Sequence, residues 1–244
     1  MKKLIGDLFA NTDILIASSN KKIEKWKNIR ASFISKMFPK HGRRVPELRF
    51  KGFSGEWQEY KLGEYVEFRR GSFPQPYGKK EWYDGYGAMP FVQVIDVADN
   101  MKLVDDTKQK ISLQAQPMSV LAKKDQVVVT LQGSIGRVAV LQYDAYIDRT
   151  LLIFEKYNYD TNIDFFAYII KNKFDEEAKK APGGIIKTIT KEALSSFDIL
   201  MPNIEEQKAI ARFLYNLDKN IECQQQKVTK LKQIKEAFLS KMFV

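Results

Sequence analysis

The sequence predicts an α+β fold in which one globular domain lies between two long helices that form an antiparallel coiled coil. Three observations support this prediction. An internal repeat brackets the chain, both copies of the repeat carry a helical apolar period, and short strand-like runs fill the segment between them. We expect the first helix at residues 1–38, the globular domain at 39–206 and the second helix at 207–244.

The repeat relates the two ends of the 244-residue chain. Residues 35–38 read Ser-Lys-Met-Phe, and the same four residues recur at 240–243, an offset of 205. The same offset pairs Asp13 with Asp218 and continues through several apolar positions, which a chance four-letter match would not do. We therefore interpret the two ends as copies of one structural element. Polar residues interrupt the apolar pattern at matching places, Ser19 with Gln224 and Arg30 with Lys235.

Both copies repeat apolar residues at the three- and four-residue spacing of a helix, over roughly five heptads and without an internal proline. A seam of this length is typical of a coiled coil, and each helix would extend about 55 Å. The alternative is two surface helices packed on one core. We expect the seam to contain Ile5, Phe9, Ile16, Ile23, Trp26, Phe33 and Met37 in the first copy, and Ile210, Leu214, Leu217, Ile221, Val228, Leu231, Phe238 and Met242 in the second.

The segment between the helices contains short β-branched or aromatic runs separated by Gly, Asp and Pro. A helix is predicted at residues 164–180, and a short one at 190–196 with Thr190 as its N-cap. The pattern indicates an α+β globule with long loops. Strands are predicted at residues 91–97, 127–131, 138–141, 151–154 and 197–201, the last ended by Pro202.

The charge is distributed unevenly along the chain, which has a formal net charge of +10 and a pI near 9.4. Residues 1–44 hold 11 basic and 3 acidic side chains, residues 45–206 hold 21 and 24, and residues 207–244 hold 8 and 3. The excess positive charge therefore belongs to the predicted helices. The central domain is close to neutral and offers local basic patches, unlike a protein that coats DNA uniformly.

The sequence lacks the residues that common catalytic sites require. One cysteine, Cys223, and one histidine, His41, exclude a disulfide framework and a Cys/His zinc site. No phosphate-binding loop, metalloprotease motif or methyltransferase signature is present. We interpret His41 as a linker residue and Cys223 as a helix-surface residue, and we expect a non-catalytic binding protein with neither metal nor cofactor.

The same features predict a reduced, cytoplasmic chain, because cysteine pairs are absent. Asp7 and Asp13 interrupt the N-terminal apolar stretch, so we expect no signal peptide. No apolar run approaches membrane-spanning length, so we also expect no contact with a membrane.

The segment at residues 68–83 is the richest candidate for ligand contact, because two prolines and two glycines favour a loop that projects its polar side chains. Arginine can read guanine with two hydrogen bonds, glutamine can read adenine, and lysine can hold phosphate. The alternative is a solvated loop whose aromatic residues pack into the core. The candidate DNA-binding residues are Arg69, Arg70, Ser72, Gln75, Tyr77, Lys79 and Lys80.

Two further glycine-containing segments are candidates. Residues 130–137 read as a strand, a turn and the start of another strand, with donors on Gln132, Ser134 and Arg137. An ordinary β-turn explains the same glycines. Residues 181–188 contain paired glycines, and Lys187 could reach a phosphate, although a hinge between a helix and a strand is an equal alternative.

Several motifs in this order resemble the specificity (S, HsdS) subunits of Type I restriction-modification systems, and together they cover essentially the whole chain. The joint after the first helix resembles the central joint of those subunits, and the entry to the second helix resembles their exit from a target-recognition domain. The loops resemble recurrent elements of such domains. The residues concerned are Lys36–Pro39, Pro46–Phe53, Trp57, Leu62–Glu64, Arg70–Ser72, Gly133–Gly136, Pro202–Ala211 and Leu217–Asp218.

The resemblance implies a subunit without catalytic activity whose globular domain reads one half of a bipartite double-stranded DNA target. The helices would act as a ruler and dock the methyltransferase (M) subunits, which would bind S-adenosylmethionine. The restriction (R) subunit would add ATP-dependent translocation and cleavage.

This chain has one recognition domain where a full S subunit has two, so we expect a homodimer or pairing with another half subunit. The alternative function is a coiled-coil adaptor or inhibitor that is derived from an S subunit and binds only protein.

Overall fold

The computed structural model describes residues 2–40, 42–180 and 189–242, and side chains from residue 6 to residue 241 within those ranges. The candidates His41 and Lys187, and the side chains of Ile5 and Met242, lie outside this description. The chain divides into two compact units. One comprises Met1–Gly55 with Ala209–Val244, and the other comprises Glu56–Lys208.

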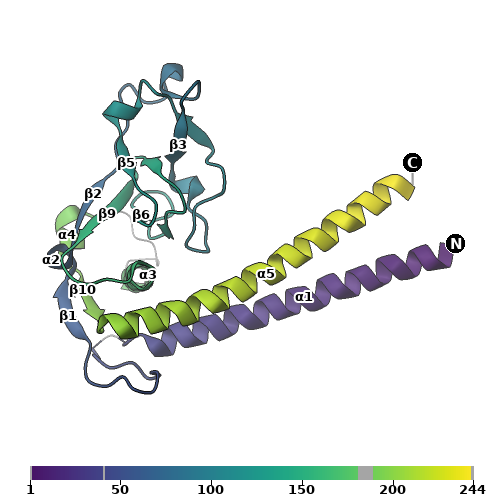
Figure 1. Ribbon diagram of the computed structural model, residues 1–244, viewed down its shortest axis with the longest axis horizontal. Coiled ribbons are helices and arrows are strands. Elements are labelled where there is room, and N and C mark those ends of the chain that lie inside the picture. The colour runs from purple at the N-terminus through teal and green to yellow at the C-terminus, as the bar shows by residue number, and fades with distance from the viewer. Residues whose placement is uncertain (1, 41, 181–188, 243–244) are drawn as a thin grey trace. The chain divides into compact units, whose positions relative to one another are not determined.

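The helical unit is built on α1 (Lys2–Met37) and α5 (Ile204–Met242), which pack antiparallel as the repeat predicted (Figure 1). Helix α5 begins three residues before the expected position. The cause is an N-cap, because the side chain of Asn203 accepts a hydrogen bond from the backbone N–H of Glu206 at 2.9 Å. The preceding Pro202 separates this cap from the last strand.

The middle of the helix pair has an apolar core formed by Ile23, Ile221 and Val228, with Ile16 and Trp26 packed against it. Ile16 and Ile221 are equivalent in the repeat, as are Ile23 and Val228, so each helix gives matching residues to this core. Among the other seam residues, Met37, Ile210, Leu214 and Leu217 are buried, and Phe9, Phe33 and Leu231 are half-buried.

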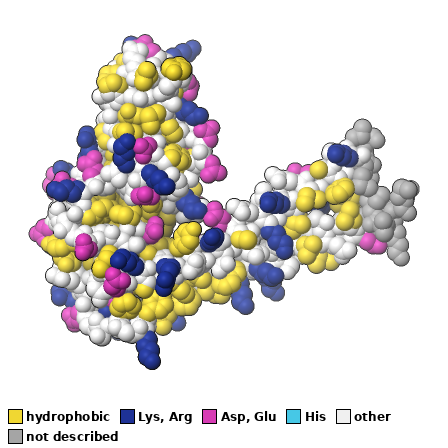
Figure 2. Space-filling view, viewed as in Figure 1, with side chains coloured by type: hydrophobic (Ala, Val, Ile, Leu, Met, Phe, Trp, Pro, Cys, Tyr) yellow, Lys and Arg dark blue, Asp and Glu magenta, His cyan; other side chains and the backbone are white. Residues whose placement is uncertain are grey.

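Phe238 departs from the predicted seam, because 44% of its surface is exposed. It lies near the C-terminal end of α5, beyond the apolar core around Ile23 and beyond Lys235, which pairs with Asp13. Hydrophobic side chains are visible between the Lys and Arg side chains on the surface of the helix pair (Figure 2).

Two ion pairs join the helices at repeat-related positions. Arg30 binds Asp218, with its Nη2 3.4 Å from Oδ2, and Lys235 binds Asp13 at 2.6 and 2.8 Å. Asp218 is the repeat equivalent of Asp13, and Lys235 is the equivalent of Arg30. The same contact is therefore made twice with the helices exchanged, which gives the pair local two-fold symmetry and sets its register.

The globular unit contains two four-stranded sheets and a two-stranded sheet. The first, antiparallel throughout, has the order β2-β9-β6-β7, and the second, with the order β4-β3-β8-β5, pairs β3 with β8 in parallel. In the two-stranded sheet β1 pairs antiparallel with β10. The strands are β1 (Gln58–Lys61), β2 (Val66–Arg70), β3 (Met89–Val92), β4 (Gln109–Ile111), β5 (Val120–Ala122), β6 (Val127–Thr130), β7 (Val138–Val140), β8 (Ala145–Ile147), β9 (Leu151–Tyr157) and β10 (Asp198–Met201).

Helix α3 (Ile163–Lys180) covers part of the first sheet and buries Phe165, Phe166 and Phe174. The rings of Phe166 and Phe154 of β9 meet edge to face with centroids 5.1 Å apart. Among the described residues, no helix combines the length and the apolar character needed to cross a membrane. The short helices are α2 (Leu62–Tyr65), α4 (Lys191–Ser195), and the 3-10 turns η1 (Lys80–Trp82), η2 (Val94–Asp96) and η3 (Gln116–Met118).

Local hydrogen bonds explain where the predicted elements succeed and fail. Thr190 caps α4 as predicted, since its Oγ1 accepts from the N–H of Ala193 at 3.2 Å. The strand predicted at 91–97 ends at Val92, because the Asp96 carboxylate accepts the N–H of Gln93 at 2.8 Å and closes a 3-10 turn. Strands β1, β2, β4, β5 and β8 were not predicted, because short strands with mixed side chains carry a weak pattern.

We predict that the ion pair Arg30–Asp218 contributes more to stability than Lys235–Asp13. Its side chains are 24% and 33% exposed, against 30% and 55% for the other pair. Double-mutant cycles with alanine, followed by urea unfolding, should give a coupling energy of about 1 kcal/mol for the first pair and a few tenths for the second. Equal couplings would contradict this ranking.

Candidate nucleic-acid interface

The two four-stranded sheets meet where the chain leaves β2. The N–H of Gly71 donates to the carbonyl of Leu151 at 3.1 Å, and the N–H of Ser72 donates to the carbonyl of Ile147 at 3.0 Å. A Cβ atom at Gly71 would lie 2.2 Å from the Ile147 carbonyl oxygen, so only glycine fits this crossing. The crossing holds the end of β2 beside the turn between β8 and β9.

This turn is organised by Asp148, which is 1% exposed. Its Oδ1 accepts hydrogen bonds from the N–H of Thr150 at 2.9 Å and from the Thr150 hydroxyl, and its Oδ2 accepts from the hydroxyl of Tyr77 at 3.1 Å. The Tyr77 hydroxyl in turn accepts from Nε2 of Gln93 at 2.9 Å. A buried carboxylate needs such donors, so this network ties three separate segments together.

Tyr77 is held firmly, although 44% of its surface is exposed. Burial of the hydroxyl, followed by the nearby charge of Asp148, raises the pKa of Tyr77 to about 12, so the hydroxyl stays a hydrogen-bond donor at neutral pH. Its ring packs on Phe73, with centroids 4.9 Å apart, and the guanidinium carbon of Arg149 lies 5.4 Å from the ring centroid. The loop is therefore ordered around this tyrosine.

The second candidate loop, between β6 and β7, borders the same region. The N–H of Leu131 donates to the carbonyl of Thr150 at 2.8 Å, and a Cβ atom at Gly133 would lie 3.6 Å from Val94, the neighbour of Gln93. The side chain of Phe174 leaves no room for a Cβ atom at Gly136, at 2.9 Å, so that glycine serves packing on α3.

The structure corrects the predicted placement of two arginines. Arg69 and Arg70 do not project from a loop, because they are the last residues of β2 and pair with Ile153 and Leu152 of β9. The glycines and prolines that favour a loop begin only at Gly71, after the strand has ended. Both arginine side chains are exposed.

The other candidates differ in whether their side chains already contact other groups of the protein. Lys79 pairs with Glu81 at 2.5 Å and lies 5.1 Å above the ring of Trp82. Arg137 donates to the carbonyl of Val97 at 3.2 Å and lies 3.5 Å from a carboxylate oxygen of Asp99. The Ser72 hydroxyl donates to the carbonyl of Met118 at 3.2 Å. The exposed side chains are Gln75, Lys80, Gln132 and Ser134.

Gln93 and Arg149 are parts of this region that sequence reasoning missed. They reach it through contacts with Tyr77, which lies 16 residues from Gln93 in the sequence, so local patterns do not reveal them. The sequence pattern that could have pointed to Arg149 is the run Asp148–Thr150, three polar residues directly between two buried strands. A polar turn at that position indicates either a structural network or a contact surface.

The region presents a set of hydrogen-bond donors suited to nucleic acid. Exposed arginines stand at the end of β2 and on the turn after β8, and exposed amides lie on the adjacent loops. Such groups bind phosphates and base edges. Among the described residues, no cluster of His, Cys, Asp and Glu could hold a metal ion. We define the recognition surface as Arg69, Arg70, Gln75, Tyr77, Lys79, Lys80, Gln93, Gln132, Ser134 and Arg149.

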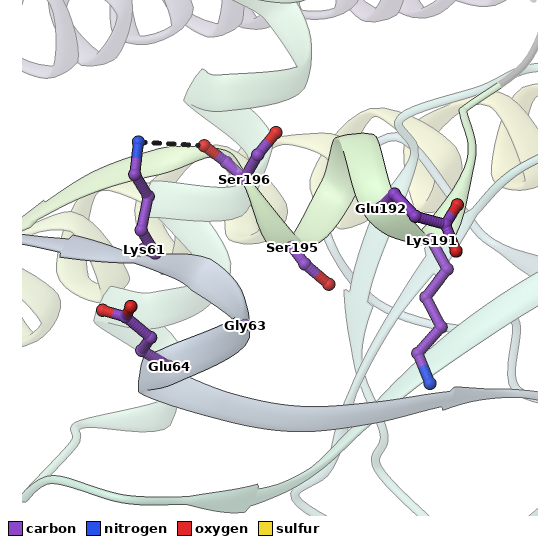
Figure 3. Close-up of a pocket in the computed structure, with 7 residues that line it drawn as sticks. All are labelled: Lys61, Gly63, Glu64, Lys191, Glu192, Ser195 and Ser196. Atoms are coloured by element: carbon purple, nitrogen blue, oxygen red, sulfur yellow. Dashed lines mark hydrogen bonds between the residues drawn. The ribbon is translucent and has the colours of Figure 1, made fainter.

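A shallow pocket lies away from these residues, between α2 and α4 (Figure 3). Nζ of Lys61 donates to the carbonyl of Ser196 at 3.4 Å and to the Asp198 carboxylate at 2.5 Å. Its two lysines and two glutamates balance in charge, so the pocket has no preference for an anion. It is lined by Lys61, Gly63, Glu64, Lys191, Glu192, Ser195 and Ser196.

Comparison with known protein families gives one clear result. The family model for the "Type I restriction modification DNA specificity domain" matches residues 54–233. Two curated proteins of Methanocaldococcus jannaschii are also similar. The putative type I restriction enzyme MjaX specificity subunit is 24% identical over 243 residues, covering 98% of this chain and 55% of the relative. The type I restriction enzyme MjaVIII specificity subunit is 23% identical over 207 residues, covering 83% and 44%. The chain thus spans about half the length of these relatives.

Solved structures show the same fold. The HsdS subunit from Thermoanaerobacter tengcongensis gives a TM-score of 0.62 at 19% identity, covering 98% of this chain and 57% of that one. The Type-I restriction-modification system S subunit from M. genitalium gives 0.65 at 15% identity, covering 97% and 59%. A chain from a study of complex assembly and conformational transition in a type I R-M system gives 0.65 at 19%, covering 98% and 57%.

We predict that Tyr77→Phe lowers the free energy of unfolding by about 1 kcal/mol, because it removes a hydrogen-bond donor from the buried Asp148 carboxylate. Urea unfolding followed by circular dichroism would measure the loss. Tyr86→Phe is the matched control, since Tyr86 is 98% exposed, and it should unfold as the unaltered chain does. No difference between the two variants would show that the Tyr77 hydroxyl has no stabilising role.

Proposed function

The chain belongs to the Type I restriction-modification DNA specificity family, and from this premise we propose that it reads one half of a bipartite double-stranded DNA target. DNA target recognition is the function of this family, which is non-catalytic. The observation that carries the proposal is the recognition surface, where the Asp148–Tyr77 network holds Gln93 and Arg149 and further exposed arginines and amides lie on the adjoining segments. No catalytic group is needed for this role.

Within the recognition surface, some residues suit base edges and others suit phosphates. Arg69, Arg70, Gln75 and Gln132 have exposed side chains whose donors suit base edges. Lys79 and Lys80 are also exposed, and their ammonium groups suit phosphates. The globular domain has a formal charge close to zero, so most of its affinity for a target would come from a few placed contacts.

The helix pair would dock the M subunits and set the distance between half-targets. It carries most of the excess positive charge, and part of its surface is apolar (Figure 2). We assign S-adenosylmethionine to the M subunit, translocation and cleavage to the R subunit, and the complex to the cytoplasm.

Co-expression with an M subunit of a related Type I system tests the proposal. We expect M to copurify and new methylated adenines to define one bipartite motif across the host genome, mapped by long-read sequencing. Expression of M alone is the control and should give no motif. Copurification without a motif would favour an inhibitor or adaptor, and a chain that does not bind M would contradict the proposal.

We further propose that two copies of the chain associate through the helix pair. Its exposed surface includes large apolar side chains, which favour burial against a partner. They lie on both helices, so a second copy could cover them with equivalent residues. They include Leu8 at 45%, Ile14 at 65%, Leu15 at 49%, Ile234 at 50% and Phe238 at 44%.

We predict a dimer by sedimentation at micromolar concentration without M subunits, and a monomer after Ile14→Lys with Leu15→Lys. The charged side chains would prevent burial of this face but would still fit an exposed helix. Asn20→Lys with Asn28→Lys adds the same charge at exposed polar positions of α1, away from Leu8, Ile14 and Leu15, and should leave the dimer intact. A monomeric unaltered chain would contradict the proposal.

A further inference from the structure

The turn between β8 and β9 holds the backbone around one arginine, Arg149, in a fixed position. On one side of Arg149, the N–H of Asp148 donates to the carbonyl of Val92 at 3.0 Å. On the other side, the carbonyl of Thr150 accepts from Leu131 at 2.8 Å, and the Asp148 side chain binds Thr150. The backbone of the turn is thus tied to β3 and to the β6–β7 loop, while the Arg149 side chain stays exposed.

The Arg149 guanidinium lies over a tyrosine that is itself fixed. Its central carbon is 5.4 Å from the Tyr77 ring centroid, a distance at which a cation and an aromatic ring attract. The Tyr77 hydroxyl is bonded to Asp148 and Gln93, so the ring cannot turn away without breaking two hydrogen bonds. A guanidinium that stacks through its face keeps its N–H groups directed outward in its own plane.

The neighbouring carboxylate does not compete for these donors. Both oxygens of Asp148 already accept hydrogen bonds from Thr150 or Tyr77, and the side chain is 1% exposed. Asp148 is therefore buried beneath the surface and serves to hold the turn and the ring. By contrast, Arg137 on the adjacent loop directs its guanidinium to the carbonyl of Val97 and the carboxylate of Asp99, which leaves it less suited to an external contact.

We propose that Arg149 determines specificity by reading a guanine with two hydrogen bonds, and that Tyr77 is its positioning residue. Guanine offers two acceptors, O6 and N7, on one edge in the major groove, which matches the planar fork of arginine. Ordering the side chain before binding reduces the entropy lost on contact. This inference rests on the proposed function and names a base-reading residue within it.

The test uses the chain assembled with its M subunit and the motif found for the unaltered complex. We expect Arg149→Ala and Arg149→Lys to relax one guanine position of the methylated motif and to weaken binding of the cognate duplex roughly 10- to 100-fold. Lysine keeps the charge but lacks the planar fork, so it separates base reading from attraction to phosphate. Lys191→Ala, at an exposed lysine on α4, is the control and should change neither readout.

Variants of the tyrosine test the positioning role. Tyr77→Ala should relax the same guanine position, because the ring beneath Arg149 is removed. Tyr77→Phe keeps the ring but removes the two hydrogen bonds of the hydroxyl, so it should relax the guanine position less than Tyr77→Ala does. A change at a different motif position would overturn the assignment of Tyr77.

Three outcomes would overturn the inference about Arg149. The first is an unchanged motif with affinity within about twofold in both arginine variants. The second is a uniform loss of affinity across sequences with a shallower salt dependence, which identifies a phosphate contact. The third is the absence of any motif with the unaltered complex. In that case the proposed function itself fails and the assignment of Arg149 falls with it.

Discussion

Burial of the Asp148 carboxylate imposes a constraint on the loops of the globular domain, because an ionised carboxylate removed from water needs hydrogen-bond donors. The donors come from Thr150, which is local, and from Tyr77, which lies 71 residues away along the chain. The 93–96 turn is connected to this network by the hydrogen bond from Gln93 to Tyr77. The 130–137 loop is connected to it by a backbone hydrogen bond to Thr150. Loops that would otherwise move independently are held around one buried charge.

This arrangement suits a protein that distinguishes DNA sequences with a nearly neutral domain. A strongly basic surface binds DNA tightly but without sequence preference. Here the positive charge belongs mainly to the helices, and the recognition surface offers a few donors in fixed positions. Fixed donors discriminate well, because a wrong base leaves them without an acceptor. The same reasoning explains why Lys79 and Arg137, which already have protein partners, are less suited to reading bases.

In the helix pair, the internal sequence repeat sets the register of the two helices. The repeated sequence gives both helices the same apolar and polar pattern, and antiparallel packing turns that repetition into a local two-fold relation. The pairs Arg30–Asp218 and Lys235–Asp13 are one contact made twice, and the apolar core between them uses equivalent residues from both helices. Shifting the helices by one turn would break both pairs and expose the core, so a single register is favoured.

The sequence by itself determined the α+β class, the two helices, their antiparallel pairing and the family, because these depend on period, repetition and the order of motifs. It also identified Thr190 as a helix cap, since capping is a local interaction. Only the tertiary structure decided that Arg69 and Arg70 end a strand, that Phe238 lies outside the seam, and that Arg149 and Gln93 meet Tyr77. Each of those outcomes depends on segments far away in sequence: β9 for the arginines, the packing of α5 on α1 for Phe238, and Tyr77 for Arg149 and Gln93. Local patterns record what a segment prefers, whereas its final neighbours are set by packing across the whole domain.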